Sequence, residues 1–270
     1  MNVVICNPRN AVSAVRLGLP VLTELGNMAD YINIINWGRS DAPDNEKVIN
    51  KGCYVARSVD KAQYLKDLNN NNVSCPMIVG SGTTVCSGSW VMRPDAHEEG
   101  SDFRLHNCEE DGDMTLNPGY HATKFISPTR EYRIWFAGSR YMTAKRIPRP
   151  SEDETDETCR SKWGYRFVDN FPGAIELCNE ARQVVPIQFG AFDVLWATEE
   201  RKWYILEVNS APSLDHDRVR SFMVPGIKSL MRPAPVVAHG VPPRDAITVT
   251  PPPRRRIKVM TMAGWEEIEV

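Results

Sequence analysis

Two apolar segments near residue 200 constrain the fold more than any other part of the chain, because polar side chains interrupt both of them. Residues 189–196 (FGAFDVLW) and 203–208 (WYILEV) predict two β-strands joined by a short polar turn. If the chain turns midway between them, Asp193 lies opposite Glu207, with about 5 Å between their Cβ atoms. Because side chains alternate along a strand with a period of two, Asn209 falls on the same face as Glu207.

The predicted convergence of Asp193, Glu207 and Asn209 indicates a cation site. Two carboxylates and an amide oxygen among apolar residues repel one another unless a positive charge lies between them. Hard oxygen ligands of this kind suit Mg²⁺ or Mn²⁺, which proteins commonly share with substrate phosphates. Spacing alone leaves a second interpretation open, namely a solvent-facing polar stripe on an amphipathic hairpin.

Basic side chains form the counterpart of these carboxylates, because several of them lie on predicted strands rather than in loops. On strands that face a carboxylate pair, such cations could stabilise the charge that develops on a transferring phosphoryl group. For any single one of these residues, an ordinary salt-bridged strand surface is the alternative. The residues are Arg93, Lys124, Arg133, Lys145 and Arg146.

The order of predicted elements indicates an α+β fold with a small N-terminal α/β domain. Within residues 1–75 we expect a strand at Val3 to Cys6, a helix over residues 11–25 interrupted at Pro20, and a strand at Tyr31 to Asn36. This βαβ rhythm favours a small parallel sheet with a helix packed on it.

Residues 76–232 predict a larger unit of mostly antiparallel strands with two helices. The expected strands are 121–126, 131–136, 140–147 and the hairpin described above, and the expected helices are 172–185 and 217–230. From residue 233 onward a Pro-rich linker leads into a tail, 256–270, whose alternation predicts a second hairpin.

Composition excludes several functional classes. The 270 residues carry a formal net charge of −2, whereas binding to nucleic acid needs a basic surplus, so we expect no nucleic-acid partner. No run of about 18 apolar residues predicts a membrane span, and the N-terminus has no signal-peptide pattern. The seven cysteines form no C-x-x-C motif, so we expect free thiols in the reducing cytoplasm.

The segment 205–215 (ILEVNSAPSLD) resembles the closing motif of ATP-grasp proteins, in which E-x-N followed by a turn of small residues and proline supplies Mg²⁺ ligands. The resemblance implies that Asp193 is the upstream metal carboxylate. The segment 131–146 (EYRIWFAGSRYMTAKR) is similar to the E-Y-R strand, turn and returning basic strand of the same superfamily. It implies that Arg133 and Arg146 act on the phosphate or acyl-phosphate, with Lys145 close by.

The same resemblance implies a set of nucleotide contacts. Residues 121–126 look like the strand that leads into the adenine-binding hinge, so Lys124, Phe125 and Ile126 become candidate contacts of ATP. The segment 91–100 (VMRPDAHEEG) resembles a family segment in which many relatives place a lysine on the α-phosphate. Arg93 occupies that position, and arginine is not interchangeable with lysine.

The N-terminal segments 7–22 (NPRNAVSAVRLGLPVL) and 35–41 (INWGRSD) resemble ATP-grasp proteins encoded by tailed bacteriophages, a RimK-like branch. A phage origin would place the protein in the cytoplasm of the host cell. The implied activity is an ATP- and Mg²⁺-dependent ligation of a small-molecule or peptide carboxylate, activated as an acyl-phosphate, to an amine. Two alternatives stay open: an ATP-binding interaction module without turnover, and a kinase on the same fold.

Overall fold

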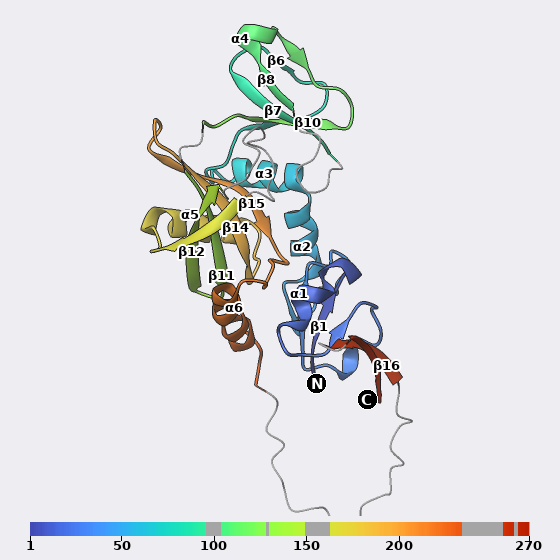
Figure 1. Ribbon diagram of the computed structural model, residues 1–270. Coiled ribbons are helices and arrows are strands. Elements are labelled where there is room, and N and C mark those ends of the chain that lie inside the picture. Colours follow the sequence, from blue (N-terminus) through green and yellow to red (C-terminus); the bar gives the residue numbers. More distant parts are fainter. Residues whose placement is uncertain (96–103, 128–129, 149–162, 234–255, 262–263, 270) are drawn as a thin grey trace, which may run out of the picture.

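The computed structural model describes residues 1–95, 104–127, 130–148, 163–233, 256–261 and 264–269 (Figure 1). Helices and strands are mixed throughout, as the α+β prediction requires. Three sheets organise the chain: a six-stranded sheet built from both ends of the sequence, a small four-stranded sheet and an antiparallel five-stranded sheet. No helix within the described ranges is long and apolar enough to cross a membrane.

The six-stranded sheet contains the predicted parallel unit. Strands β1 (Asn2–Cys6), β2 (Val21–Leu22), β3 (Asn33–Trp37) and β4 (Val48–Ile49) run parallel, with β1 between β2 and β3. They are rich in Val, Ile and Asn side chains that are almost completely buried. Short helical segments connect them: η1 (Pro8–Asn10), α1 (Ala11–Val15) and η2 (Met28–Asp30).

The expected helix over residues 11–25 is wrong in its extent. Helix α1 ends at Val15, Gly18 adopts a left-handed φ of 67°, and β2 begins directly after Pro20. A left-handed glycine followed by a proline ends a helix, because neither residue can continue its hydrogen-bond pattern without strain. The apolar residues that suggested one long helix are therefore divided between a single helical turn and a buried strand.

The C-terminal tail returns to this sheet. Strands β16 (Arg256–Thr261) and β17 (Gly264–Glu269) form an antiparallel hairpin, which confirms the prediction for the tail. The hairpin joins the edge strand β2 through the pair Met260 and Val21. The predicted Pro-rich linker lies almost entirely outside the described residues.

Helices α2 (Gly52–Val59) and α3 (Lys61–Asn70) follow the N-terminal strands and pack against the five-stranded sheet rather than against their own. The side chain of Asp60 accepts a hydrogen bond from the backbone N–H of Gln63 at 2.9 Å and so caps the start of α3. The helical part of residues 1–75 thus contributes to the core of the following unit, and the boundary at residue 75 stays a prediction.

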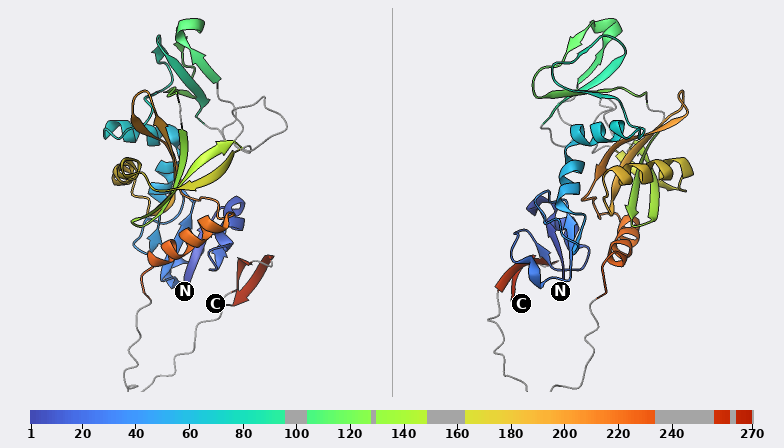
Figure 2. Two further views of the ribbon diagram at one scale, coloured as in Figure 1. Left: turned by 60° about the vertical axis from the view of Figure 1, so that its left-hand side comes forward. Right: turned by 180° about the vertical axis from the view of Figure 1, so that it is seen from behind.

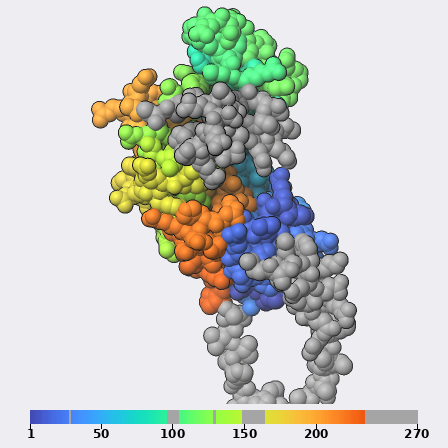
Figure 3. Space-filling model, in the orientation of Figure 1, coloured from blue at the N-terminus to red at the C-terminus, as the bar shows by residue number. Residues whose placement is uncertain are grey.

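The small sheet forms a lobe at one end of the molecule, drawn in green in the space-filling view (Figure 3). Its strand order is β5 (Ile78–Val79), β10 (Tyr120–Lys124), β7 (Ser89–Pro94), β8 (Arg104–Asn107). A second small ladder pairs β6 (Thr84–Val85) with β9 (Met114–Thr115), and helix α4 (Cys108–Asp111) lies beside β8. These elements enclose a separate small core around the buried side chain of Trp90.

The five-stranded sheet is the centre of the molecule (Figure 2). Its order is β13 (Trp163–Val168), β12 (Arg140–Pro148), β11 (Arg130–Ala137), β14 (Phe189–Ala197), β15 (Lys202–Asn209), with antiparallel pairing throughout. Helix α5 (Pro172–Val184) covers one face together with α2 and α3. Helix α6 (Asp217–Ser229) and the N-terminal strands cover part of the other face.

The joint between the N-terminal sheet and the five-stranded sheet is tightly packed. Trp37, at the end of β3, stacks on Phe189, the first residue of β14, with 5.3 Å between ring centroids. The next residue, Gly38, adopts a left-handed φ of 79°, and a Cβ atom there would lie only 2.8 Å from the Cβ of Ala211. This position therefore excludes any side chain, both by backbone conformation and by space.

Candidate functional site

The predicted opposition of Asp193 and Glu207 is confirmed. In the register of β14 and β15, Asp193 pairs with Glu207 and Ala191 with Asn209, so all three polar side chains belong to one face. A β-bulge follows directly, because Val194 pairs with Ile205 and Leu206 is the extra residue. Asp193 is only 2% exposed and Glu207 only 8% exposed, so the solvent-facing alternative for this hairpin is wrong.

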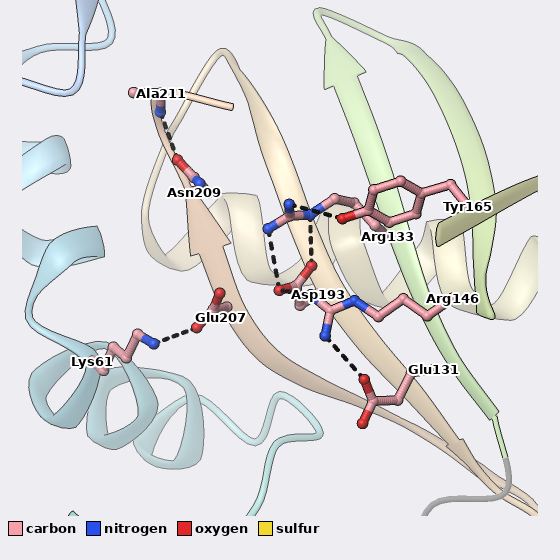
Figure 4. Close-up of polar contacts among 9 residues, drawn as sticks. All are labelled: Lys61, Glu131, Arg133, Arg146, Tyr165, Asp193, Glu207, Asn209 and Ala211. Carbon is pink, nitrogen blue, oxygen red and sulfur yellow. Dashed lines mark hydrogen bonds and ion pairs between the residues drawn. The ribbon is translucent and has the colours of Figure 1, made fainter. Parts of the chain in front are cut away.

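Two arginines neutralise Asp193 (Figure 4). Arg133 lies opposite Asp193 on the neighbouring strand β11 and binds both carboxylate oxygens, with Nε–Oδ1 at 2.8 Å and Nη2–Oδ2 at 3.2 Å. Arg146, from β12, donates from Nη2 to Oδ2 of Asp193 at 2.8 Å. Three adjacent strands therefore place two guanidinium groups on one buried carboxylate. Arg133 binds it in the bidentate geometry that arginine favours, and Arg146 adds a single hydrogen bond.

Three further residues, which the sequence had not marked as site residues, complete the cluster. Glu131 accepts a hydrogen bond from Nη1 of Arg146 at 3.0 Å, and the hydroxyl of Tyr165 on β13 accepts one from Nη1 of Arg133 at 3.2 Å. Lys61, the first residue of α3, places Nζ 2.5 Å from Oε2 of Glu207. In the ion pairs of this cluster, three carboxylates thus face three cations.

Burial and charge set the protonation behaviour of the cluster. Burial raises the pKa of Asp193 above its ordinary value, and Glu207 raises it further, whereas Arg133 and Arg146 act in the opposite direction. Burial alone would lower the pKa of Arg133, but the charges of Asp193, Tyr165 and Glu207 and the hydrogen bond to Asp193 together outweigh burial and raise that pKa. The same balance raises the pKa of Arg146. Both guanidinium groups therefore stay charged.

The cluster has the donor chemistry that a divalent cation needs, and the protein's own cations occupy the same oxygens. Oxygen atoms of Asp193 and Glu207 converge between strands, and each already binds a positively charged nitrogen. A buried carboxylate pair requires such compensation. Within the described part of the chain, no group of three or more His, Cys, Asp or Glu side chains could hold a metal. A metal at this cluster would therefore be bound by Asp193, Glu207, Asn209 and oxygen atoms of a bound substrate.

Comparison with known proteins identifies the architecture. No family model and no curated protein matches the sequence. Among solved structures, the fold is similar to that of the ATP-grasp ligase PsnB complexed with a minimal precursor, Mg and ADP, with a TM-score of 0.58 and 11% identity over 86% of this chain and 97% of that chain. The protein has the ATP-grasp fold.

Two other ATP-grasp structures support the assignment of the fold. D-alanine–D-alanine ligase from Bacillus anthracis aligns with a TM-score of 0.57 and 9% identity over 79% of this chain and 88% of its own. The macrocyclase MdnC from Microcystis aeruginosa MRC, bound with its precursor peptide MdnA, aligns with a TM-score of 0.54 and 11% identity over 87% and 100%. These three neighbours are ligases or macrocyclases, and their low identity shows the fold alone.

In this ATP-grasp fold, Asn209 lies at the end of β15, two residues beyond Glu207 on the same face. Its Oδ1 accepts a hydrogen bond from the backbone N–H of Ala211 at 2.9 Å and so shapes the turn that follows the strand (Figure 4). The structure therefore brings Asn209 to the edge of the cluster, and its role as a metal ligand stays a prediction.

Lys145 lies away from the cluster. It pairs with Tyr132 of β11, whereas Ala144 pairs with Arg133 of β11 and Arg146 pairs with Tyr165 of β13. Because neighbouring residues on a strand face opposite sides, Lys145 belongs to the face that α5 covers. Lys145 therefore lies on the face of β12 opposite to Arg146, and its predicted role beside the nucleotide stays a prediction.

The four remaining candidates lie on the small sheet and on the chain that leaves it. Arg93 is on β7, and the exposed Lys124 ends β10. Phe125 is 39% exposed and donates its backbone N–H to the carbonyl of Ser89 at 2.8 Å. Ile126 is buried against Leu195, Ala197 and Tyr204 of the large sheet. Residues 124–126 therefore connect the two sheets, and their nucleotide contacts stay predictions.

Proposed function

We propose that the protein is an ATP- and Mg²⁺-dependent ligase that activates a carboxylate as an acyl-phosphate and joins it to an amine. The observation that carries the proposal is the buried pair of Asp193 and Glu207, opposed across two strands of an ATP-grasp fold, with Arg133 and Arg146 on the same face. Preorganised cations beside a carboxylate pair suit phosphoryl transfer, in which catalysis consists largely of positioning and charge stabilisation.

The residues have separable roles in this proposal. Asp193, Glu207 and Asn209 would hold Mg²⁺, which when bound neutralises and orients the phosphates of ATP. Arg133 and Arg146 stabilise negative charge on the transferred phosphoryl group, and Asp193 and Tyr165 hold the Arg133 guanidinium in place. Arg93, Lys124, Phe125 and Ile126 would contact the nucleotide between the two sheets.

The structural neighbours indicate which substrates to test first. PsnB and MdnC are solved with precursor peptides, and D-alanine–D-alanine ligase is named for the amino acids that it joins. Peptides with acidic side chains, and free amino acids, therefore form the first panel of carboxylate donors and amine acceptors.

The experiment measures ADP release by the purified protein with Mg²⁺, ATP and this panel, for the wild type, Glu207→Gln and Glu199→Gln. We expect Glu207→Gln to lose turnover, because the amide removes one negative charge from the cation site while keeping its shape. Glu199→Gln makes the same change at an exposed position in the turn of the same hairpin and should retain activity.

Three results would contradict the proposal in different ways. Wild-type turnover in Glu207→Gln would remove the carboxylate pair from the mechanism. Nucleotide binding without ADP release, for every donor and acceptor, would favour an interaction module. A stable phosphorylated product without incorporation of amine would favour a kinase.

A further inference from the structure

The ion pair between Lys61 and Glu207 joins two distant parts of the chain at the proposed metal site. Nζ of Lys61 lies 2.5 Å from Oε2 of Glu207, and the two side chains are 25% and 11% exposed. Figure 4 shows Lys61 reaching the cluster from helix α3, whereas every other charged side chain of the cluster comes from the five-stranded sheet. Lys61 is therefore the one cation of these ion pairs that the sheet itself does not supply.

The stability of helix α3 does not explain a lysine at this position. Lys61 is the first residue of α3, directly after the capping Asp60. The amino end of a helix carries partial positive charge, so a lysine in the first turn is unfavourable by a few tenths of a kcal/mol or more. The carboxylate of Glu207, which is ion-paired with Nζ of Lys61, compensates this charge.

The charge balance of the cluster opposes the entry of a bare metal ion. Asp193 and Glu131 are neutralised by Arg133 and Arg146, and Glu207 is neutralised by Lys61. A divalent cation that entered without phosphate would add two positive charges to a cluster in which three cations already balance three carboxylates. Burial reduces the screening of this excess charge. The negative charges of a nucleotide triphosphate would remove this obstacle.

We propose that Lys61 is an internal counter-ion for Glu207, which a divalent cation must displace, so that the site accepts the metal only together with nucleotide phosphate. The inference rests on the proposed function, because it takes Glu207 to be a metal ligand. Lys61 thereby sets the affinity of the empty enzyme for free metal and couples the position of α3 to the occupancy of the site.

The experiment uses Mn²⁺ as the probe and follows its binding by electron paramagnetic resonance, first without and then with a non-hydrolysable ATP analogue. The proteins are the wild type, Lys61→Gln, Lys61→Arg and Lys66→Gln. Lys66→Gln makes the same change of charge on the same helix, at an exposed position away from Glu207. Thermal unfolding of each variant checks that it is folded.

Without nucleotide, we expect Lys61→Gln to bind Mn²⁺ on the order of tenfold more tightly than the wild type, because a competing unit charge has left a poorly screened site. Lys61→Arg retains the charge and should bind as weakly as the wild type, as should Lys66→Gln. With the ATP analogue present, the wild type should bind Mn²⁺ tightly.

Two results overturn the inference and are distinguishable. If the wild type binds Mn²⁺ with the analogue but Lys61→Gln gains no affinity for free Mn²⁺, Lys61 is not the counter-ion and the proposed function stands. If the wild type binds no Mn²⁺ even with the analogue, the proposed function fails and the inference fails with it.

Discussion

The side chain of Asn50 forms hydrogen bonds to both polar groups of the Phe189 backbone: Nδ2 donates to the carbonyl oxygen at 2.9 Å, and Oδ1 accepts from the N–H at 3.3 Å. Oδ1 also accepts from the backbone N–H of Gln188 at 2.7 Å. Asn50 is fully buried and adopts a left-handed φ of 62°. One side chain thus connects the end of the N-terminal sheet to the first residue of β14, the strand that carries Asp193.

Replacement of Asn50 by Ala should destabilise the protein by about 2–4 kcal/mol. It leaves buried backbone groups without hydrogen-bond partners, and it places alanine in a left-handed conformation that asparagine tolerates better. The measurement is urea unfolding. Asn72→Ala is the control: Asn72 has a φ of 59° but is exposed, so it should lose only about 1 kcal/mol or less. Equal losses in both variants would argue against the role of the Asn50 hydrogen bonds.

Replacement of Asp193 by Ala should destabilise the fold as well as remove activity. Asp193 is the carboxylate on which Arg133 and Arg146 both converge, and the two arginine side chains are only 15% and 9% exposed. Breaking a buried ion pair from one side typically costs about 3–5 kcal/mol. Asp193→Asn keeps the volume and one acceptor, so we expect a smaller loss in the same unfolding measurement.

Glu131→Gln is the matched control for Asp193, because Glu131 also pairs with Arg146 but is 33% exposed. It should change the free energy of unfolding by only about 0–1 kcal/mol. If Asp193→Ala were no more destabilised than Glu131→Gln, the positive charges of Arg133 and Arg146 would not depend on Asp193 for their neutralisation.

Thiol reactivity should separate the cysteines by burial. We expect a thiol reagent at pH 7.5 to label the native protein at the exposed positions first, and the buried ones only after unfolding, because reaction requires an accessible thiolate. Peptide mapping by mass spectrometry reads out the sites. Within the described residues, Cys53 and Cys86 are exposed, and Cys6, Cys75, Cys108 and Cys178 are buried.

The buried thiols also predict a loss of stability at alkaline pH. Burial raises the pKa of Cys6 from 9.0 to about 11 and that of Cys75 from 9.0 to about 12. The unfolded chain therefore releases these thiol protons at lower pH than the folded protein does. The contribution of the two buried thiols to the free energy of unfolding is intact below pH 9 and is lost as the pH rises toward 11 or 12. Unfolding midpoints at pH 8 and pH 10.5 should differ less in Cys75→Ala than in the wild type, whereas Cys86→Ser, at an exposed position, should keep the full difference.

Much of the large sheet is predictable from sequence, because its apolar runs are long and its polar interruptions fall at matching distances from one turn. This is why the opposition of Asp193 and Glu207 could be derived from spacing. Helix α5 and helix α6, whose apolar residues recur at helical intervals, were predicted with boundaries within one residue of those observed.

The remaining parts of the site depend on information that a local pattern does not carry. The contact between Lys61 and Glu207 joins a helix start to a strand far along the chain, and only the tertiary fold brings them together. Tyr165 reaches Arg133 across an intervening strand, which no periodicity indicates. Lys145 is different, because it is adjacent to Arg146 on one strand and the sequence alone therefore implies that the two side chains point to opposite faces. This alternation is a better guide to their positions than the fact that both side chains are positively charged.

Gly38 determines how near the N-terminal sheet can approach the loop that follows β15. Because this contact is made by a residue with no side chain against the methyl group of Ala211, the joint is already at its minimum width. Any substitution at position 38 can only push the two units apart, and with them the loop that begins at Asn209. Replacing Ala211 with glycine would remove the methyl group from this contact, but Nδ2 of Asn10, which would lie 3.0 Å from a Cβ atom at position 38, still limits the space there. The spacing between the two units is therefore fixed from both sides of Gly38.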